Sequence, residues 1–251
     1  MDDFCLILQG PPIDKEYLVK FCKYYRDQGI KNIIVSTYSN FVLPELHDYV
    51  TDIVLNDNIG QIKVKGIIKR RPEQVIFSYD KHELGQDFTP HANFTWHIIT
   101  TRRGINKANE VTKCKYYIKV RADVLIANIP DLIDNWINNI FSIKNNEIFD
   151  HKIILVDNQH SPKFKRISFY FIDYLAIGSK DDLTKYYFFN KINKIGGAES
   201  MISSSYISEK SPGISCKEAK TKYFYFDSNI QFIFKKYNIS PDGLILDKLL
   251  P

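Results

Sequence analysis

An α/β fold with a mostly parallel sheet flanked by helices is the class that this sequence predicts. Short apolar segments alternate with amphipathic helical segments along the 251 residues, a pattern typical of βαβ units. The first apolar segment, Phe4 to Leu8, contains no charged or amide residue, as in strands buried on both faces. The elements begin in the order strand, helix, strand, strand, which implies right-handed crossovers. No repeat or Ser/Gly-rich linker interrupts the chain, so we expect one domain over residues 1–251.

The first helix is predicted between two strands. Asp14 and Glu16 suit its positive N-terminus, and Gly29 suits the position just after its last residue. The next two strands are expected at Asn32–Tyr38 and Asp52–Leu55, where apolar and β-branched residues gather.

The middle of the chain is less regular. We expect a variable loop region over residues 56–90, with one strand at Val75–Tyr79 inside it. A helix is predicted over Ala92–Arg102, and Gly104 is expected to end it. The next strand is predicted at Tyr116–Val120.

The second half continues the alternation. Pro130 is expected to open a helix, and Ile153–Val156 is the next predicted strand. Ile167–Ile177 is a longer apolar segment, and Ser179 then starts a capping-box pattern for a helix through Tyr187.

Two more helices are predicted towards the end of the sequence. One begins at Glu199. The other is capped by Asp227 or Ser228 and shows the spacing i, i+3, i+4, i+7 of an amphipathic helix. Its apolar residues are Ile230, Ile233, Phe234 and Tyr237.

Composition and charge exclude several classes of protein. The hydrophobic content of 44% and the charged content of 25% are ordinary for a globular chain, which excludes disordered and collagen-like proteins. No apolar run approaches the roughly 18 to 20 residues that span a bilayer. No signal sequence is recognised, so a cytoplasmic location is expected. The net charge of +5 is mild and no nucleic-acid-binding motif is present, so no nucleic-acid partner is expected.

The basic residues gather in three places, residues 63–71, 113–121 and 163–166. Such clusters form a solvated face or attract an anionic partner, and they allow peripheral association with a membrane. The four cysteines form no Cys-x-x-Cys pair, so reduced thiols are expected, with Cys5 and Cys22 in the core. The motifs His-Glu-x-x-His and Gly-x-Ser-x-Gly are absent, which leaves zinc proteases and serine hydrolases without support.

Residues after the first strand form the first candidate site, because open α/β sheets bind ligands beyond the carboxyl ends of their strands. Gln9, Gly10, Pro11 and Pro12 follow that strand. Glycine lets a ligand approach the backbone, and the Gln9 amide can hydrogen-bond a base or a ribose. The alternative is a plain strand-ending turn, since neither a dinucleotide-binding nor a P-loop pattern is present.

Charged residues at strand ends and helix starts form the remaining candidates. Asp123 can hold a divalent metal that bridges a diphosphate, and Arg121 can neutralise the same diphosphate; the alternative is a structural ion pair or a helix cap. Asp173 stands within an apolar segment, and Glu199 follows a glycine-rich turn. Either can act as a general base, or as a structural carboxylate bonded to backbone amides or a first-turn helix acid.

Four segments carry a recognisable pattern in this order: Leu6–Pro12, His97–Ala108, Tyr116–Ile126 and Phe171–Tyr187, followed by Gly197–Ser200. Together they resemble the WavE family of lipopolysaccharide-synthesis proteins, which are identified as glycosyltransferases of the GT-A type. The chain departs from the pattern at Ile172, where the family has Ser, and at Arg121, which occupies the place of the first Asp in an Asp-x-Asp motif.

The resemblance implies a GT-A-like, Rossmann-like fold and an enzyme that moves a sugar from a nucleotide-diphosphate donor to the hydroxyl of a glycan or lipid-linked glycan. Residues 1–126 would form the nucleotide-sugar half and residues 127–251 the acceptor half. The implied metal is Mn²⁺ or Mg²⁺, held by Asp123, and the implied base of an inverting reaction is Glu199 or, second, Asp173. The implied nucleotide-sugar-binding residues are Gln9, Gly10, Pro11, Arg102, Arg103 and Arg121.

Two other functions remain open at this point. A sugar nucleotidyltransferase shares the sheet and the nucleotide-diphosphate chemistry, but it usually has a glycine-rich loop with a basic residue after the first strand. A non-catalytic module that binds nucleic acid or another anionic surface is consistent with the basic clusters.

Overall fold

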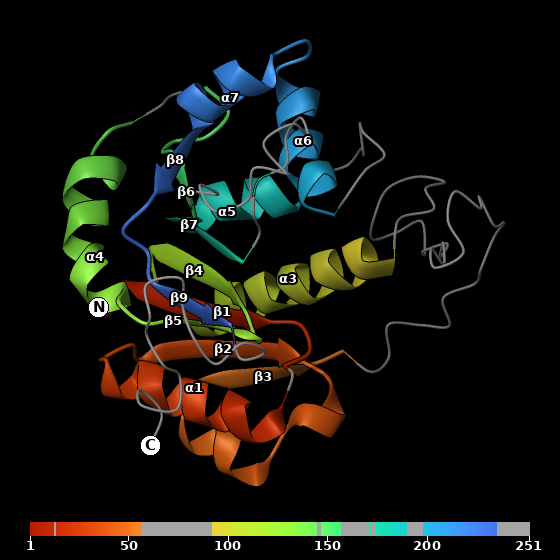
Figure 1. Cartoon of the computed structure of the whole chain (residues 1–251), viewed down its shortest axis with the longest axis vertical. Helices are drawn as coiled ribbons and strands as arrows, with labels where there is room; N and C mark the ends of the chain where they lie inside the picture. Colours follow the sequence, from red (N-terminus) through yellow and green to blue (C-terminus); the bar gives the residue numbers. More distant parts are fainter. Residues whose placement is uncertain are drawn as a thin grey trace, which may run out of the picture.

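A seven-stranded sheet is the centre of the molecule (Figure 1). The computed structural model describes residues 1–12, 14–56, 92–144, 147–156, 171, 174–189 and 198–234. The strand order is β3-β2-β1-β4-β7-β6-β8. The strands are β1 (Phe4–Gln9), β2 (Asn32–Thr37), β3 (Asp52–Leu55), β4 (Tyr116–Arg121), β6 (Ile153–Val156), β7 (Leu175–Ser179) and β8 (Phe224–Asp227). A separate pair consists of β5 (Val124–Ile126) and β9 (Phe232–Phe234).

The sheet is mostly parallel, as predicted. β1 pairs in parallel with β2 and β4, β2 with β3, and β6 with β8. Among the strands that the structure describes in this sheet, β7 alone runs antiparallel to its neighbours, β4 and β6. The predicted α/β class, with helices flanking a mostly parallel sheet, is therefore confirmed.

Helices cover both faces of the sheet (Figure 1). The apolar sides of α1 (Lys15–Asp27) and α4 (Ile129–Trp136) share one hydrophobic cluster with one face. The helices on the other face are α3 (Ala92–Val111), α5 (Lys180–Tyr187), α6 (Ala198–Lys210) and α7 (Cys216–Tyr223). Two 3-10 helices, Ser39–Phe41 and Pro44–Asp48, precede β3, and a π-helical turn, Ile137–Phe141, extends α4. No helix in the described ranges is long and apolar enough to cross a membrane.

The predicted ends of two helices are confirmed by their capping bonds. The Asp14 side chain accepts a hydrogen bond from the Glu16 backbone N–H at 2.8 Å, which starts α1. Gly29 follows α1 with φ of 88°, a conformation that glycine adopts without strain. Ser179 caps α5 by accepting the Asp182 backbone N–H at 3.1 Å.

The prediction that a helix ends at Gly104 is wrong. α3 continues through this residue to Val111. A Cβ at Gly104 would lie 2.7 Å from Ile7 Cγ2 and 3.2 Å from Ser36 Cβ. The glycine therefore lies where α3 packs closely against β1 and β2, and the side chains of the sheet leave little space for a larger residue.

The predicted last helix, with its cap at Asp227 or Ser228, is also wrong. Residues Phe224–Asp227 and Phe232–Phe234 form β8 and β9. Asp227 caps no helix: its Oδ2 accepts the Trp136 indole N–H at 2.9 Å and its Oδ1 accepts the Asn229 backbone N–H at 2.9 Å. The apolar spacing that suggested a helix arises from a turn and a short strand, both with residues buried in the core.

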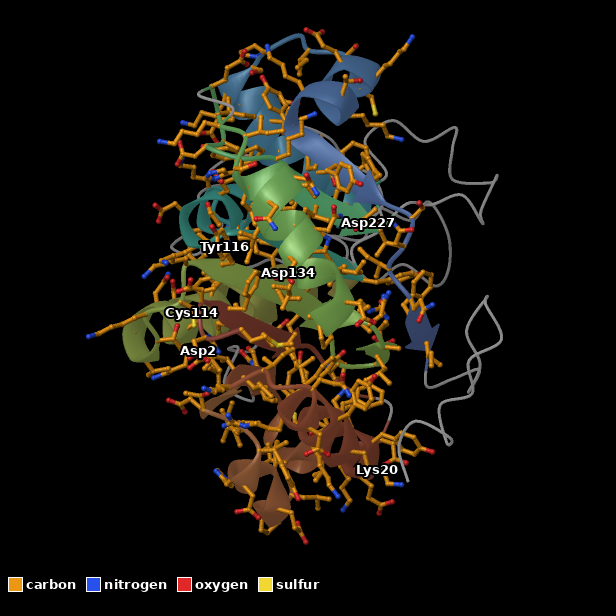
Figure 2. The ribbon with its side chains drawn as sticks, turned by 90° about the vertical axis from the view of Figure 1, so that its left-hand side faces the viewer. Asp2, Lys20, Cys114, Tyr116, Asp134 and Asp227 are labelled. Carbon is orange, nitrogen blue, oxygen red and sulfur yellow. The ribbon has the colours of Figure 1, made fainter. Side chains whose placement is uncertain are left out.

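The face covered by α4 is shown in Figure 2, where Tyr116 and Asp227 are labelled. Tyr116, the first residue of β4, stacks on Phe141 with ring centroids 4.5 Å apart. The bond from Trp136 to Asp227 joins α4 to the end of β8. Several predictions concern residues outside the described ranges. They are the loop region over 56–90 beyond Asn56 with its strand Val75–Tyr79, the basic clusters at 63–71 and 163–166, the part of Ile167–Ile177 that contains Asp173, and Tyr237 of the last predicted helix.

Candidate functional site

The carboxyl ends of β1 and β4 form the candidate site. Gln9 and Arg121 are partners in the parallel register of these strands, and the Ala122 backbone N–H donates to the Gln9 carbonyl at 2.9 Å. The chain leaves β1 towards β2 and β3 on one side, and β4 adds to the sheet on the other. The strand order thus reverses between β1 and β4, which is where open α/β sheets bind ligands. The fold therefore brings the Gln9 turn together with Arg121 and Asp123.

The turn after β1 depends on Gly10. This residue has φ of 87°, which an L-side chain rarely adopts. Its N–H donates to the Ser36 carbonyl at 2.9 Å, and its carbonyl accepts the Thr37 hydroxyl at 3.1 Å. No heavy atom beyond its chain neighbours lies within 4 Å of the position that a Cβ would take. Because Pro11 is exposed, this turn offers a place where backbone and proline ring can meet a ligand.

The Gln9 side chain, in contrast, is turned towards α3. It is 3% exposed. Its Oε1 accepts the Thr100 hydroxyl at 2.7 Å, and its Nε2 lies 3.1 Å from His97 Nε2. The Gln9 amide thus links the end of β1 to α3, and in this arrangement its polar atoms contact other residues inside the protein. Its predicted bond to a nucleoside stays a prediction.

A buried lysine lies beside this link. Lys119 is completely buried, its Nζ is 2.8 Å from His97 Nε2, and it lies 5.8 Å from the centre of the Tyr187 ring. Lys119 Nζ and Gln9 Nε2 thus both lie within hydrogen-bond distance of the same ring nitrogen of His97. Sequence reasoning missed this cluster by treating Lys119 as part of a basic surface. The available signal was the position of Lys119 between Ile118 and Val120, inside a strand whose preceding residues are apolar or aromatic.

Arg121 and Asp123 form a two-pronged ion pair. Arg121 Nε donates to Asp123 Oδ1 at 2.9 Å, and Nη2 donates to Oδ2 at 2.6 Å. The guanidinium carbon lies 5.1 Å from the centre of the Tyr174 ring. The side chain of Arg121 is 33% exposed and that of Asp123 is 17% exposed. The guanidinium is thus held along one edge by Asp123 and lies over a ring, and the Arg121 side chain as a whole is partly exposed.

A divalent cation does not fit the donor set that the structure describes. Both oxygens of Asp123 bond to Arg121. Within the described residues, no group of three His, Cys, Asp or Glu side chains is placed to hold a metal. A single carboxylate already paired with a guanidinium is a poor ligand set for Mg²⁺ or Mn²⁺. The described residues thus give no support to a metal here, and the role of Asp123 as a metal ligand stays a prediction.

Arg102 and Arg103, predicted to contact the diphosphate, lie in α3. Arg102 is 9% exposed, and its Nε and Nη2 donate to the carbonyls of Tyr187 at 2.7 Å and Phe189 at 2.9 Å. These bonds join α3 to the end of α5. Arg103 is half-buried. Glu199 is the second residue of α6, in agreement with the predicted helix start, and Asp173 lies outside the described residues.

Comparison with known proteins reveals similarity only at the level of solved structures. No protein-family model matches the chain, and no relative was found among curated proteins. HddC from Yersinia pseudotuberculosis, in complex with GMP-PN, is 11% identical, and the match covers 92% of this chain and 93% of HddC with a TM-score of 0.44. The galactosyltransferase LgtC, in complex with donor and acceptor sugar analogues, is 11% identical over 87% of this chain and 70% of LgtC, with a TM-score of 0.34. A glycosyltransferase involved in glycosylation of the major capsid of PBCV-1 is 10% identical over 89% of this chain and 81% of that enzyme, with a TM-score of 0.36.

Proposed function

We propose that this protein is a GT-A-type glycosyltransferase of surface glycan or polysaccharide synthesis. It transfers a sugar from a nucleotide-diphosphate donor to a hydroxyl of a glycan or a lipid-linked glycan. One observation carries this proposal: the glycine turn after β1 and Arg121, whose side chain is partly exposed, lie side by side where the strand order reverses. A site of this kind suits a ligand with a flat, neutral part and a strongly anionic part.

The two parts of a nucleotide diphosphate have matching surfaces at this site. The turn of Gly10 and Pro11 is assigned to the nucleoside, because its backbone approaches open space. Arg121 is assigned to the diphosphate, because a guanidinium forms paired hydrogen bonds with phosphate oxygens. Negative charge grows on the leaving diphosphate as the bond from the sugar carbon to its oxygen breaks. A cation fixed beforehand at that position stabilises the transition state.

The acceptor hydroxyl must lose a proton as it bonds to the sugar carbon. Glu199 is the first candidate for the base, since α6 starts with this residue in its first turn, and Asp173 is the second. Either carboxylate would take the proton directly from the hydroxyl. Inversion of the sugar follows if that single displacement is the whole reaction.

The resemblance to the WavE family supports the same site. The segment Leu6–Pro12 covers β1 and the glycine turn, and Tyr116–Ile126 covers β4, Arg121, Asp123 and β5. The segment His97–Ala108 lies in α3, whose His97 and Thr100 contact Gln9. Three segments that are distant in sequence thus meet at the ends of β1 and β4.

A thermal-shift panel tests the proposal. UDP, GDP, CDP, ADP and their sugar conjugates are added to the protein, each with Mn²⁺, with Mg²⁺ and with EDTA. A ligand at 100 times its Kd stabilises the native state by about 2.7 kcal/mol, which raises Tm by a few degrees. The conjugate with the largest shift then serves as donor in a transfer assay with glycan acceptors.

The expected result is a shift with one nucleotide and sugar transfer from its conjugate, both lost in Arg121→Ala. The same protein with a nucleoside triphosphate and a sugar 1-phosphate tests the nucleotidyltransferase alternative, and formation of a nucleotide sugar there would contradict the proposal. The absence of a shift with every nucleotide would contradict it as well and would favour a binding module.

A further inference from the structure

The Gln9 side chain is held inside the protein by α3. Gln9 is the last residue of β1 and is 3% exposed. Its Oε1 accepts the Thr100 hydroxyl at 2.7 Å, and its Nε2 lies 3.1 Å from His97 Nε2. Thr100 is itself fully buried, and both partners belong to α3, far from Gln9 in the chain. Both polar ends of the Gln9 amide are therefore engaged by one helix of the layer above the sheet.

These contacts make Gln9 a poor reader of a nucleoside. An amide that swung out to bond a base would give up the 2.7 Å bond from Thr100 and the contact with His97. Loss of a partner by a buried polar group costs free energy, and a hydrogen bond inside the protein is stronger than one in water. A bond from Gln9 to a base would therefore exchange one hydrogen bond for another and contribute little net affinity.

Gln9 is also one of the points that hold the Gly10 turn. The Gln9 carbonyl accepts the Ala122 N–H at 2.9 Å on the β4 side. On the β2 side, the Gly10 N–H donates to the Ser36 carbonyl at 2.9 Å, and the Gly10 carbonyl accepts the Thr37 hydroxyl at 3.1 Å. The backbone is thus tied to both neighbouring strands, and the Gln9 side chain adds a tie to α3. Together these ties fix the direction in which the chain enters Gly10, whose φ is 87°.

We propose that Gln9 is a positioning residue for the turn of Gly10 and Pro11, and that it acts through its bond to Thr100 instead of through a bond to the nucleoside. This inference rests on the proposed function and assigns how the nucleoside part of the same site is built. A turn that is fixed before binding loses little conformational entropy when the ligand arrives. A turn released from α3 has to be ordered by the ligand. That cost is the same for every base, so the role predicts a uniform loss of affinity.

Base selectivity separates a positioning role of Gln9 from a base-reading role. Isothermal titration measures the Kd of UDP, GDP, CDP and ADP for the wild type and for Gln9→Ala. The variant is expected to weaken each nucleotide that the wild type binds about three- to tenfold, within the range of coupled neighbours, and to leave the ratios between nucleotides unchanged. A second measurement needs no ligand: the Gly10 amide is expected to exchange its hydrogen faster in Gln9→Ala, as NMR would show, because the turn opens more easily.

A double-mutant cycle then tests whether Gln9 acts through α3. Thr100→Val keeps the shape of the side chain but loses the hydroxyl, and it is expected to weaken binding by a similar factor. Gln9→Ala in that background is expected to add less than about twofold.

Tyr117→Phe is the matched control for this cycle. The Tyr117 hydroxyl donates to Asn109 Oδ1 at 2.8 Å, so this change removes a different bond between the sheet and α3, near the amino end of β4. The variant is expected to bind like the wild type, and urea unfolding verifies that every variant is folded. Equal weakening in Tyr117→Phe would assign the loss to a general loosening of α3 and would overturn the inference.

Three further results would overturn the inference. A loss in Gln9→Ala that is confined to one nucleotide would make Gln9 a reader of the base. A full additional loss from Gln9→Ala in the Thr100→Val background would show that Gln9 acts without this bond. Unchanged Kd values in Gln9→Ala would remove Gln9 from the binding of nucleotides. Failure of the proposed function gives a different pattern: no nucleoside diphosphate binds to the wild type, whereas the Gly10 amide still exchanges faster in Gln9→Ala. That pattern would leave Gln9 a structural tie without a role in binding.

Discussion

Asp182 shows how one buried side chain can hold several segments together. It is completely buried, and its Oδ1 accepts the Asp150 backbone N–H at 2.7 Å. Its Oδ2 accepts the His151 backbone N–H at 3.0 Å and the Ser179 hydroxyl at 2.7 Å. The sequence predicted Ser179 and Asp182 as a capping box, and that cap is confirmed. The bonds to residues 150 and 151 depend on the return of the chain to this helix start, which no local pattern indicates.

Removal of the Asp182 carboxylate is expected to destabilise the folded protein. Asp182→Ala leaves three partly buried donors without their buried acceptor and opens a cavity, so we expect the free energy of unfolding to fall by about 3 kcal/mol. Asp181→Ala is the matched control, because Asp181 is the exposed neighbour in the same first turn, and its loss should cost less than about 1 kcal/mol. Urea unfolding followed by circular dichroism measures both. Equal losses in the two variants would contradict the role given to Asp182.

The polar residues of the candidate site were also predictable only in part: their positions follow from the sequence, whereas their contacts depend on packing. Residues Gln9 and Arg121 could be placed at the ends of two strands from the apolar runs that precede them; that these strands are neighbours was decided by the sheet. The engagement of Gln9 with His97 and Thr100 could not, because α3 begins outside the range of any local signal from β1 and its contacts are decided by packing. The same holds for the contact of Lys119 with His97.

At the scale of the element, the prediction of helices and strands failed where tertiary packing overrides local preference. Gly104 resembles a helix end in sequence, but it lies inside α3. A glycine stands there because a side chain would collide with Ile7. Ile230 and Ile233 have helical spacing, but Ile230 follows a turn and Ile233 belongs to β9, which pairs with β5. Spacing alone does not distinguish a helical face from short buried segments.

Gly104→Ala tests the close approach of α3 to the sheet. Alanine favours a helix interior by about 1 kcal/mol over glycine, but the added Cβ would lie 2.7 Å from Ile7 Cγ2. The collision should outweigh this gain, and we expect a net destabilisation of about 1–3 kcal/mol. Asn106→Ala, at an exposed position of the same helix, should leave stability unchanged or slightly raised. Thermal unfolding of both variants measures the difference, and a stabilised Gly104→Ala would show that the helix can shift away from the sheet.

At the scale of the whole molecule, the burial of the cysteine thiols shows which parts of the packed layers are closed to solvent. Cys5 lies in β1 and Cys22 in α1, and both are fully buried, whereas Cys114 is 4% exposed. Burial raises the pKa of all three thiols, which lowers the fraction of reactive thiolate. Cys216 is half-buried at the start of α7.

A thiol-reactive dye at pH 8 is therefore expected to modify Cys216 quickly in the native protein and the other three only as the molecule unfolds. Cys5 lies in the sheet, Cys22 in a helix and Cys114 in the connection between α3 and β4. Because these parts pack into one core, the three thiols should react with one common rate in partial denaturant. All four should react at once in urea. Rapid native modification of a second thiol would contradict the burial of these elements, and separate rates would show that the layers open independently.

The sequence by itself determined the α/β class, most strand positions in the first half and the residues that follow β1 and β4. It did so because alternation of apolar strands with amphipathic helices is a local property. The tertiary structure decided that β7 is inserted antiparallel between β4 and β6, that residues 224–227 and 232–234 are strands, and that Arg121 binds Asp123 over Tyr174. The division of the chain into a nucleotide half and an acceptor half stays a prediction. Strand order and side-chain partners depend on contacts between residues far apart in the chain, and those are settled only when the layers pack.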